Sequence, residues 1–192
     1  MKGQRYFPVA VAVLLLDQVT KYLVAQGGVS RRPVVLLPGF LRIVYAENTG
    51  ALFGFFRRTP EPWHTVLLLV APVVSILVIL FLMRASGEAD RLAHLGLALI
   101  LGGAVGNQTD RLLRKGKVID FIDVSIDLEP VRGWLVRAFH SSHWYTFNIA
   151  DAAIVVGAAA LGLDLFLRAR GGGSRGPAGR RRRRPRRASR KD

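Results

Sequence analysis

The chain has 192 residues, which is the size of one domain, and 51% of them are hydrophobic. Its net charge is +15, of which +11 lies between Arg168 and Asp192. The chain before that basic tail is apolar rather than basic, which argues against a nucleic-acid enzyme. The lack of cysteine excludes disulfides, thiolate metal sites and a cysteine nucleophile. The composition therefore indicates a membrane protein with a basic tail.

Four apolar stretches approach the roughly 20 residues that a helix needs to cross a bilayer. They cover residues 6–25, 63–83, 92–109 and 147–167. The first is not expected to be a cleaved signal peptide, because Asp17 and Lys21 interrupt it and no small-residue cleavage site follows. We therefore expect a mainly α membrane protein with four transmembrane helices.

The cations beside these stretches predict the orientation of the chain. Lys2 and Arg5 precede the first span, Arg84 and Arg91 lie between the second and third, and the Arg-rich tail follows the fourth. Cytoplasmic loops are enriched in such cations, so both termini should be cytoplasmic. On the opposite side, strand-like runs at 33–39, 40–45 and 118–126 predict a small extracytoplasmic β-sheet.

Two regions follow from this organisation. Residues 1–170 should form one four-span membrane domain, and residues 171–192 a disordered cytoplasmic tail, because they offer almost nothing to bury in a core. The tail's cations should attract anionic lipid. Contact with nucleic acid would be non-specific.

Charged and amide side chains gather where the predicted spans meet the outer surface. A charge in the middle of a span costs about 2.5 to 3.5 kcal/mol, so each is a candidate functional residue. The set is Asp17, Lys21, Asn48, Asn107, Asp110, Arg111, Asp120, Asn148 and Asp151.

Several of these residues also have a purely structural interpretation. Asp17 and Lys21 are four residues apart and can neutralise each other on one helix. Asn107 can cap a helix end, and Asp110 with Arg111 can form an interfacial ion pair.

Other motifs are also better explained by structure than by chemistry. The glycines at 102, 103 and 106 are typical of close helix packing. The four histidines show no metal-binding spacing, so a metal site is not expected.

Asp120 and Asp151 are harder to explain as structural residues. Asp151 stands between alanines in an apolar helix, and Asp120 has only Lys117 as a nearby cation in sequence. Buried carboxylates without partners should share a proton, which is the arrangement used in aspartic proteolysis.

Two other functions remain open from the residues alone. A proton- or cation-binding transporter subunit or scaffold would need the same intramembrane carboxylates. A Ser-Lys peptidase is disfavoured, because no span holds both a lysine and a serine.

Five separated sequence blocks resemble a known family. They are DQVTK at 17–21, NTGALFG at 48–54, GGAVGNQTDR at 102–111, VIDFI at 118–122 and FNIADAAI at 147–154. Together, and in this order over residues 6–167, they resemble lipoprotein signal peptidase, the aspartic signal peptidase II family of bacterial membranes.

The resemblance implies roles for the candidate residues. Asp120 and Asp151 are expected to be the catalytic pair. The residues expected to hold substrate are Asn48, Asn107, Arg111 and Asn148. Those expected to support the site are Asp17 and Lys21, with Asp110 as a partner for Arg111.

The resemblance also implies the reaction. It is removal of the signal peptide from a diacylglyceryl-modified prolipoprotein, just before the lipidated cysteine, at the outer face of the bacterial cytoplasmic membrane. No metal or organic cofactor is implied, and globomycin-type cyclic peptides are expected inhibitors. Residues 129–140 depart from the family pattern, resembling an insertion that would form a short amphipathic helix on the membrane surface.

Overall fold

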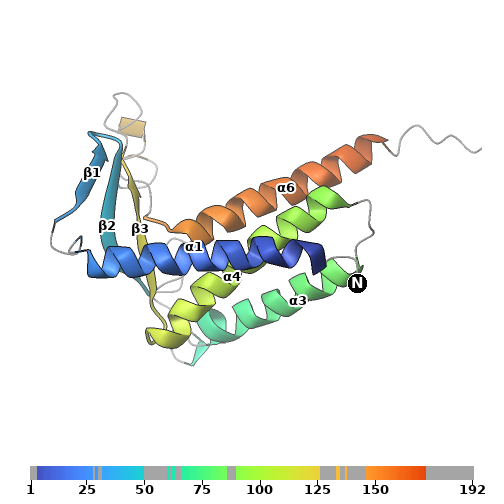
Figure 1. The fold of residues 1–192 in the computed structure, drawn as a ribbon, viewed down its shortest axis with the longest axis horizontal. Coiled ribbons are helices and arrows are strands. Elements are labelled where there is room, and N and C mark those ends of the chain that lie inside the picture. Colours follow the sequence, from blue (N-terminus) through green and yellow to red (C-terminus); the bar gives the residue numbers. More distant parts are fainter. Residues whose placement is uncertain are drawn as a thin grey trace, which may run out of the picture.

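The computed structural model describes residues 4–27, 29, 32–49, 60, 62–63, 66–85, 90–125, 133–134, 137 and 146–171. Helices lie alongside one another, and a small sheet caps one end of them (Figure 1). The helical elements are η1 (Gln4–Tyr6) with α1 (Phe7–Gln26), the π-helix η3 (Val66–Val70) with α3 (Ala71–Ala85), α4 (Arg91–Leu113) and α6 (Ile149–Gly171). The strands are β1 (Val34–Leu37), β2 (Leu41–Asn48) and β3 (Val118–Val124).

Within the described residues, three helical segments are long and apolar enough to cross a membrane. They are Gln4–Gln26, Val66–Ala85 and Ile149–Arg170, which agree with the predicted spans at 6–25, 63–83 and 147–167. Helix α4 covers the predicted span at 92–109 but does not reach the same apolarity, because buried polar side chains such as Asn107, Gln108 and Asp110 occupy its last turns. A fourth transmembrane helix therefore stays a prediction.

Glycines bring α4 close to the helices on either side of it. A Cβ atom on Gly102 would lie 2.6 Å from the carbonyl oxygen of Ala10 in α1, and one on Gly103 would collide with the carbonyl oxygen of Ala150 in α6. A Cβ on Gly106 would lie 2.7 Å from the Asp17 carboxylate. The three glycines thus have the packing role predicted from the sequence.

The sheet is antiparallel with the order β1-β2-β3, and it confirms the three predicted strand runs. Ile119 and Phe121 of β3 pack with Val24 near the end of α1. Because side chains alternate along a strand, Asp120 projects from the opposite face. Phe147, just before α6, exchanges backbone hydrogen bonds with Ile122 of β3. Strand β3 is thereby held against both α1 and the start of α6.

Some predicted features lie outside the described residues. They are the block at 50–54, the tail beyond Gly171 and most of the segment at 129–140.

Candidate active site

Asn148 links the two candidate catalytic carboxylates at the sheet end of the molecule. Its side-chain Nδ2 donates to Oδ1 of Asp120 at 2.7 Å. Its backbone N–H donates to Oδ2 of Asp151 at 3.2 Å, and its Oδ1 accepts from the backbone N–H of Asp151 at 2.9 Å. The reciprocal bonds at the start of α6 resemble those of a helix cap, so the turn that carries Asp151 also holds the amide that reaches Asp120.

Each carboxylate receives a second amide donor from another element. Asn48 of β2 donates through Nδ2 to Oδ2 of Asp120 at 3.0 Å, and Asn107 of α4 donates through Nδ2 to Oδ1 of Asp151 at 2.8 Å. The structure therefore brings together five residues from four elements or their ends, namely β2, α4, β3 and the start of α6. Hydrogen bonds from these amides fix both carboxyl planes.

Asp120 lies in a setting that disfavours its charged form. Burial raises the pKa of Asp120 to about 7, and the negative charge of Asp151 adds to the rise. The hydrogen bonds from Asn48 and Asn148 oppose this effect without reversing it. A carboxyl group with such a pKa can carry a proton near neutral pH, as a general acid must.

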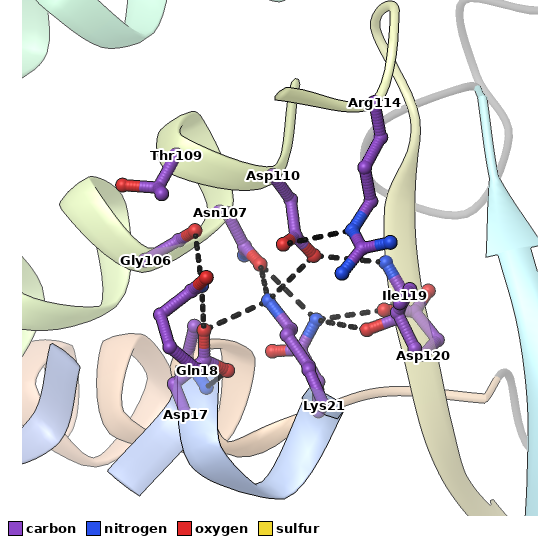
Figure 2. A network of polar contacts seen from close by, with 12 residues as sticks. Asp17, Gln18, Lys21, Gly106, Asn107, Thr109, Asp110, Arg114, Ile119 and Asp120 are labelled. Carbon is purple, nitrogen blue, oxygen red and sulfur yellow. Dashed lines mark hydrogen bonds and ion pairs between the residues drawn. The ribbon is translucent and has the colours of Figure 1, made fainter. Parts of the chain in front are cut away.

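A buried ionic cluster lies beside Asp120 (Figure 2). Lys21 Nζ is 2.8 Å from Oδ2 of Asp17 and 3.1 Å from Oδ2 of Asp110, and it donates to Oδ1 of Asn107 at 3.0 Å. All three charged side chains are almost completely buried. The bond to Asn107 fixes the orientation of that amide, so its Nδ2 faces Asp151.

The two carboxylates of this cluster hold the backbone next to each candidate catalytic residue. Asp17 Oδ1 accepts the backbone N–H of Ala150 at 3.0 Å, directly before Asp151. Asp110 Oδ2 accepts the backbone N–H of Ile119 at 3.0 Å, directly before Asp120. Lys21 contacts both carboxylates and so ties the two anchors together. Neither backbone contact can be predicted from the sequence pattern.

The partners of Asp110 differ from the predicted one. Besides Lys21, Asp110 pairs with Arg114 at 3.3 Å, whereas the prediction paired it with Arg111. Residues four apart share one side of a helix, but adjacent residues point about 100° apart, so Arg114 is the better placed cation. Arg111 is half-buried and interacts electrostatically with Asp151, Asp120 and Asp110.

The part of the chain described by the structure gathers amides, carboxylates and cations at this site. It contains no group of three or more histidine, aspartate or glutamate side chains placed to hold a metal ion. Two carboxyl groups held by amides, with an arginine nearby, suit proton transfer and stabilisation of a polarised carbonyl.

The family model for signal peptidase (SPase) II matches residues 9–167, which contain the whole of this site. The chain belongs to the signal peptidase II family. It is therefore a membrane protease.

Individual relatives agree with that assignment. A lipoprotein signal peptidase of Solibacter usitatus is 36% identical over 160 residues, covering 83% of this chain and 89% of that protein. One of Photorhabdus laumondii is 37% identical over 165 residues, covering 86% and 89%.

Two solved structures described as bacterial membrane enzymes share the fold. One has a TM-score of 0.72 at 23% identity, covering 91% of this chain and 94% of that one. The other has a TM-score of 0.67 at 24% identity, covering 84% and 92%.

Proposed function

We propose that this protease is an aspartic endopeptidase that removes the signal peptide from diacylglyceryl-modified prolipoproteins. Cleavage falls just before the lipidated cysteine, at the outer face of the bacterial cytoplasmic membrane. The observation that carries the proposal is the Asn148 bridge, which holds Asp120 and Asp151 side by side with amide donors on both. Relatives named lipoprotein signal peptidase support the choice of substrate.

In the proposed mechanism, the pair shares one proton. Ionised Asp151 accepts a proton from a water molecule whose oxygen attacks the scissile carbonyl carbon, while protonated Asp120 donates its proton to the carbonyl oxygen. The resulting diol collapses when protonated Asp151 gives the proton that it took from water to the amide nitrogen, a diol hydroxyl returns a proton to Asp120, and the C–N bond breaks. The products are a signal peptide with a new carboxylate and a lipidated cysteine with a free amine. The two carboxyl groups titrate as a unit, and the raised pKa of Asp120 favours it as the proton donor.

The surrounding residues have two proposed tasks. Asn107 and Asn148 are buried with their polar atoms already hydrogen-bonded, so they orient the carboxyl groups, while the partly exposed Asn48 orients Asp120 and also meets the substrate backbone. Arg111 is half-buried and interacts electrostatically with both carboxylates. It binds substrate carbonyl or lipid phosphate oxygens. Asp17, Lys21 and Asp110 support the site.

The acyl chains of the substrate supply binding energy away from the reacting bond. They hold the scissile bond at the membrane boundary. The sheet lies at one end of the helices (Figure 1), and Asp120 belongs to its strand β3. Both termini then lie in the cytoplasm. Globomycin-type cyclic peptides should compete for the same site.

Conservative substitution of each aspartate tests this mechanism. Asn is nearly the same size as Asp but cannot accept a proton from water, so Asp120→Asn and Asp151→Asn should each lower turnover of a lipid-modified preprolipoprotein peptide by at least about 10²-fold. Because the two groups act as one unit, the double variant should be hardly slower than either single variant. The assay uses purified protein in detergent without added metal.

Asp164→Asn is the matched control, since its carboxylate pairs with Arg168 at the far end of α6. It should keep wild-type turnover. If Asp120→Asn or Asp151→Asn keeps more than about a tenth of wild-type turnover, the pair is not the catalytic centre. A proton- or cation-binding role for the buried carboxylates would then be favoured.

A further inference from the structure

Strand β1 presents apolar side chains that the protein itself does not cover. Val34, Val35, Leu36 and Leu37 are 47%, 54%, 52% and 52% exposed, and Phe40 in the following turn is 48% exposed. Val34 and Val35 are successive residues in regular register with β2, so they point to opposite faces, and both faces of β1 carry apolar side chains that are about half exposed. A sheet edge that faces water on one side would instead alternate apolar with polar residues.

The rest of the sheet uses its apolar residues differently. Ile43 of β2 and Ile119 and Phe121 of β3 pack around Val24 of α1, and no residue of β1 belongs to this described cluster. Among the described residues, strand β1 pairs along one side, with β2, and is the outermost strand of the three. Its apolar surface is thus free for something outside the folded chain.

The same end of the molecule carries the lipid-facing surface of α1. Exposed apolar side chains follow this helix through Tyr22 and Leu23, which are 62% and 60% exposed, almost to its last residue, Gln26. Figure 1 shows the sheet at the end of the bundle where α1 ends. Val24 joins that end of α1 to β2 and β3, and β1 is the neighbour of β2, so the apolar strand lies at the same end of the molecule as these exposed side chains of α1.

We propose that β1 and its turn insert into the interfacial layer of the bilayer, with lipid on both faces of the strand. The exposed Arg32, just before β1, then lies where it can meet lipid phosphates. Since β2 pairs with β1 and also carries Asn48, this lipid contact sets the height of Asp120 relative to the membrane surface. The proposal depends on the membrane placement of the chain and not on the catalytic mechanism.

Site-directed spin labelling tests the insertion directly, because the chain has no cysteine to remove. Val34→Cys and Val35→Cys, which lie in regular register with β2 before the bulge at Leu36, place one label on each face of β1. Leu16→Cys is the lipid reference, because the Leu16 side chain is 54% exposed on the apolar surface of α1. Lys115→Cys, at an exposed turn, is the aqueous reference. Each full-length variant is reconstituted in phosphatidylcholine vesicles, and collisions of the label with oxygen and with a water-soluble nickel chelate are measured.

Insertion predicts that both β1 labels resemble Leu16→Cys, with frequent oxygen collisions and few nickel collisions. If either label resembles Lys115→Cys instead, that face is in water and the proposal is wrong. Spin–spin broadening that disappears on dilution with unlabelled protein would also overturn it, because a second copy would then cover β1. The same labels are also measured in the Asp120→Asn background. If this variant loses peptidase activity while the accessibility of the labels is unchanged, the insertion of β1 is independent of the catalytic proposal.

Discussion

At the scale of single residues, the site is organised by the cost of burying charge. Lys21, Asp17 and Asp110 are almost completely buried, and a lone ion in that position would be strongly disfavoured. One cation shared by two carboxylates leaves a negative balance, which Arg114 offsets from the more exposed side of Asp110. The remaining acceptor capacity of both carboxylates goes to backbone N–H groups of Ala150 and Ile119. The cluster is therefore stable only as a whole.

The raised pKa of Asp120 predicts a pH-dependent stability. Its folded-state pKa of about 7 exceeds the reference value of 3.8, so the folded protein holds this proton more tightly. Stability linked to Asp120 is therefore fully present below pH 3.8 and is lost as pH rises through 7. The pKa shift means that the buried charge of Asp120 lowers the stability of the wild type by about 4 kcal/mol at high pH, and an uncharged asparagine avoids this cost. The asparagine in turn gives up about 1 to 2 kcal/mol of stability, because it accepts fewer hydrogen bonds. Asp120→Asn should thus be more stable than wild type by roughly 2 kcal/mol at pH 8.

Thermal unfolding in detergent from pH 4 to pH 8 measures this difference. The advantage of Asp120→Asn should shrink toward low pH and reverse near pH 4, where the wild-type carboxyl group is protonated. Parallel stability curves for the two proteins would show that burial does not perturb this group.

Support and catalysis can be separated with two other substitutions. Asp17→Ala removes one partner of a buried ion pair and leaves Ala150 N–H without an acceptor, so it should cost about 3 to 5 kcal/mol of stability. Asn107→Ala removes an uncharged side chain whose hydrogen bonds to Lys21 and Asp151 contribute about 1 to 3 kcal/mol, and because Asp151 loses one of its donors it should mainly lower turnover. Melting temperatures and turnover in detergent give both values, and the opposite order of stability would reverse the assigned roles.

At the scale of elements, periodicity and apolar run length were enough to predict α1, α3, α6 and the three strands. Contacts between elements were not predictable in the same way, since Asp17 meets Ala150 across 133 positions of sequence. The π-helix at Val66–Val70 was also missed, although Pro72 follows it and cannot donate a backbone hydrogen bond. Gln108 of α4 donates to the carbonyl oxygen of Leu69 at this irregular turn. This hydrogen bond comes from a neighbouring helix, so the local sequence around the irregular turn contains no pattern that predicts it.

Two glycines in similar helices should respond oppositely to alanine. A Cβ on Gly103 would collide with the backbone carbonyl of Ala150, so Gly103→Ala must push α4 away from α6 and should cost at least about 1 to 3 kcal/mol. No atom lies within 4 Å of a Cβ built on Gly162 of α6, so Gly162→Ala should stabilise by up to about 1 kcal/mol through helix propensity. Unfolding in detergent compares them, and equal effects would contradict close packing at Gly103.

At the scale of the whole molecule, the two ends of the bundle differ in how they hold charge. The sheet end buries its ions around Lys21, whereas at the other end Arg168 pairs with Asp90 at 2.7 Å and Asp164 at 2.6 Å while remaining 46% exposed. Exposed pairs contribute little to stability, about 0 to 1 kcal/mol each. The buried charged groups therefore lie at the sheet end, and the exposed ion pairs at the far end join α4 to α6. Helix α6, which the basic tail follows in the sequence, ends at that far end with Gly171.

Deleting residues 172–192 should consequently separate placement in the membrane from catalysis. The truncated chain keeps every residue of the proposed site, so its turnover of a lipid-modified peptide in detergent should stay within about twofold of wild type. In cells the tail's cations can each gain about 1 kcal/mol beside anionic lipid on the cytoplasmic side, so truncation should lower the fraction of molecules with the C-terminus inside. Protease accessibility of a C-terminal epitope tag in spheroplasts reports that fraction, with the tagged full-length chain as control. A large loss of turnover in detergent by a truncated protein that melts normally would instead make the tail part of the catalytic machinery.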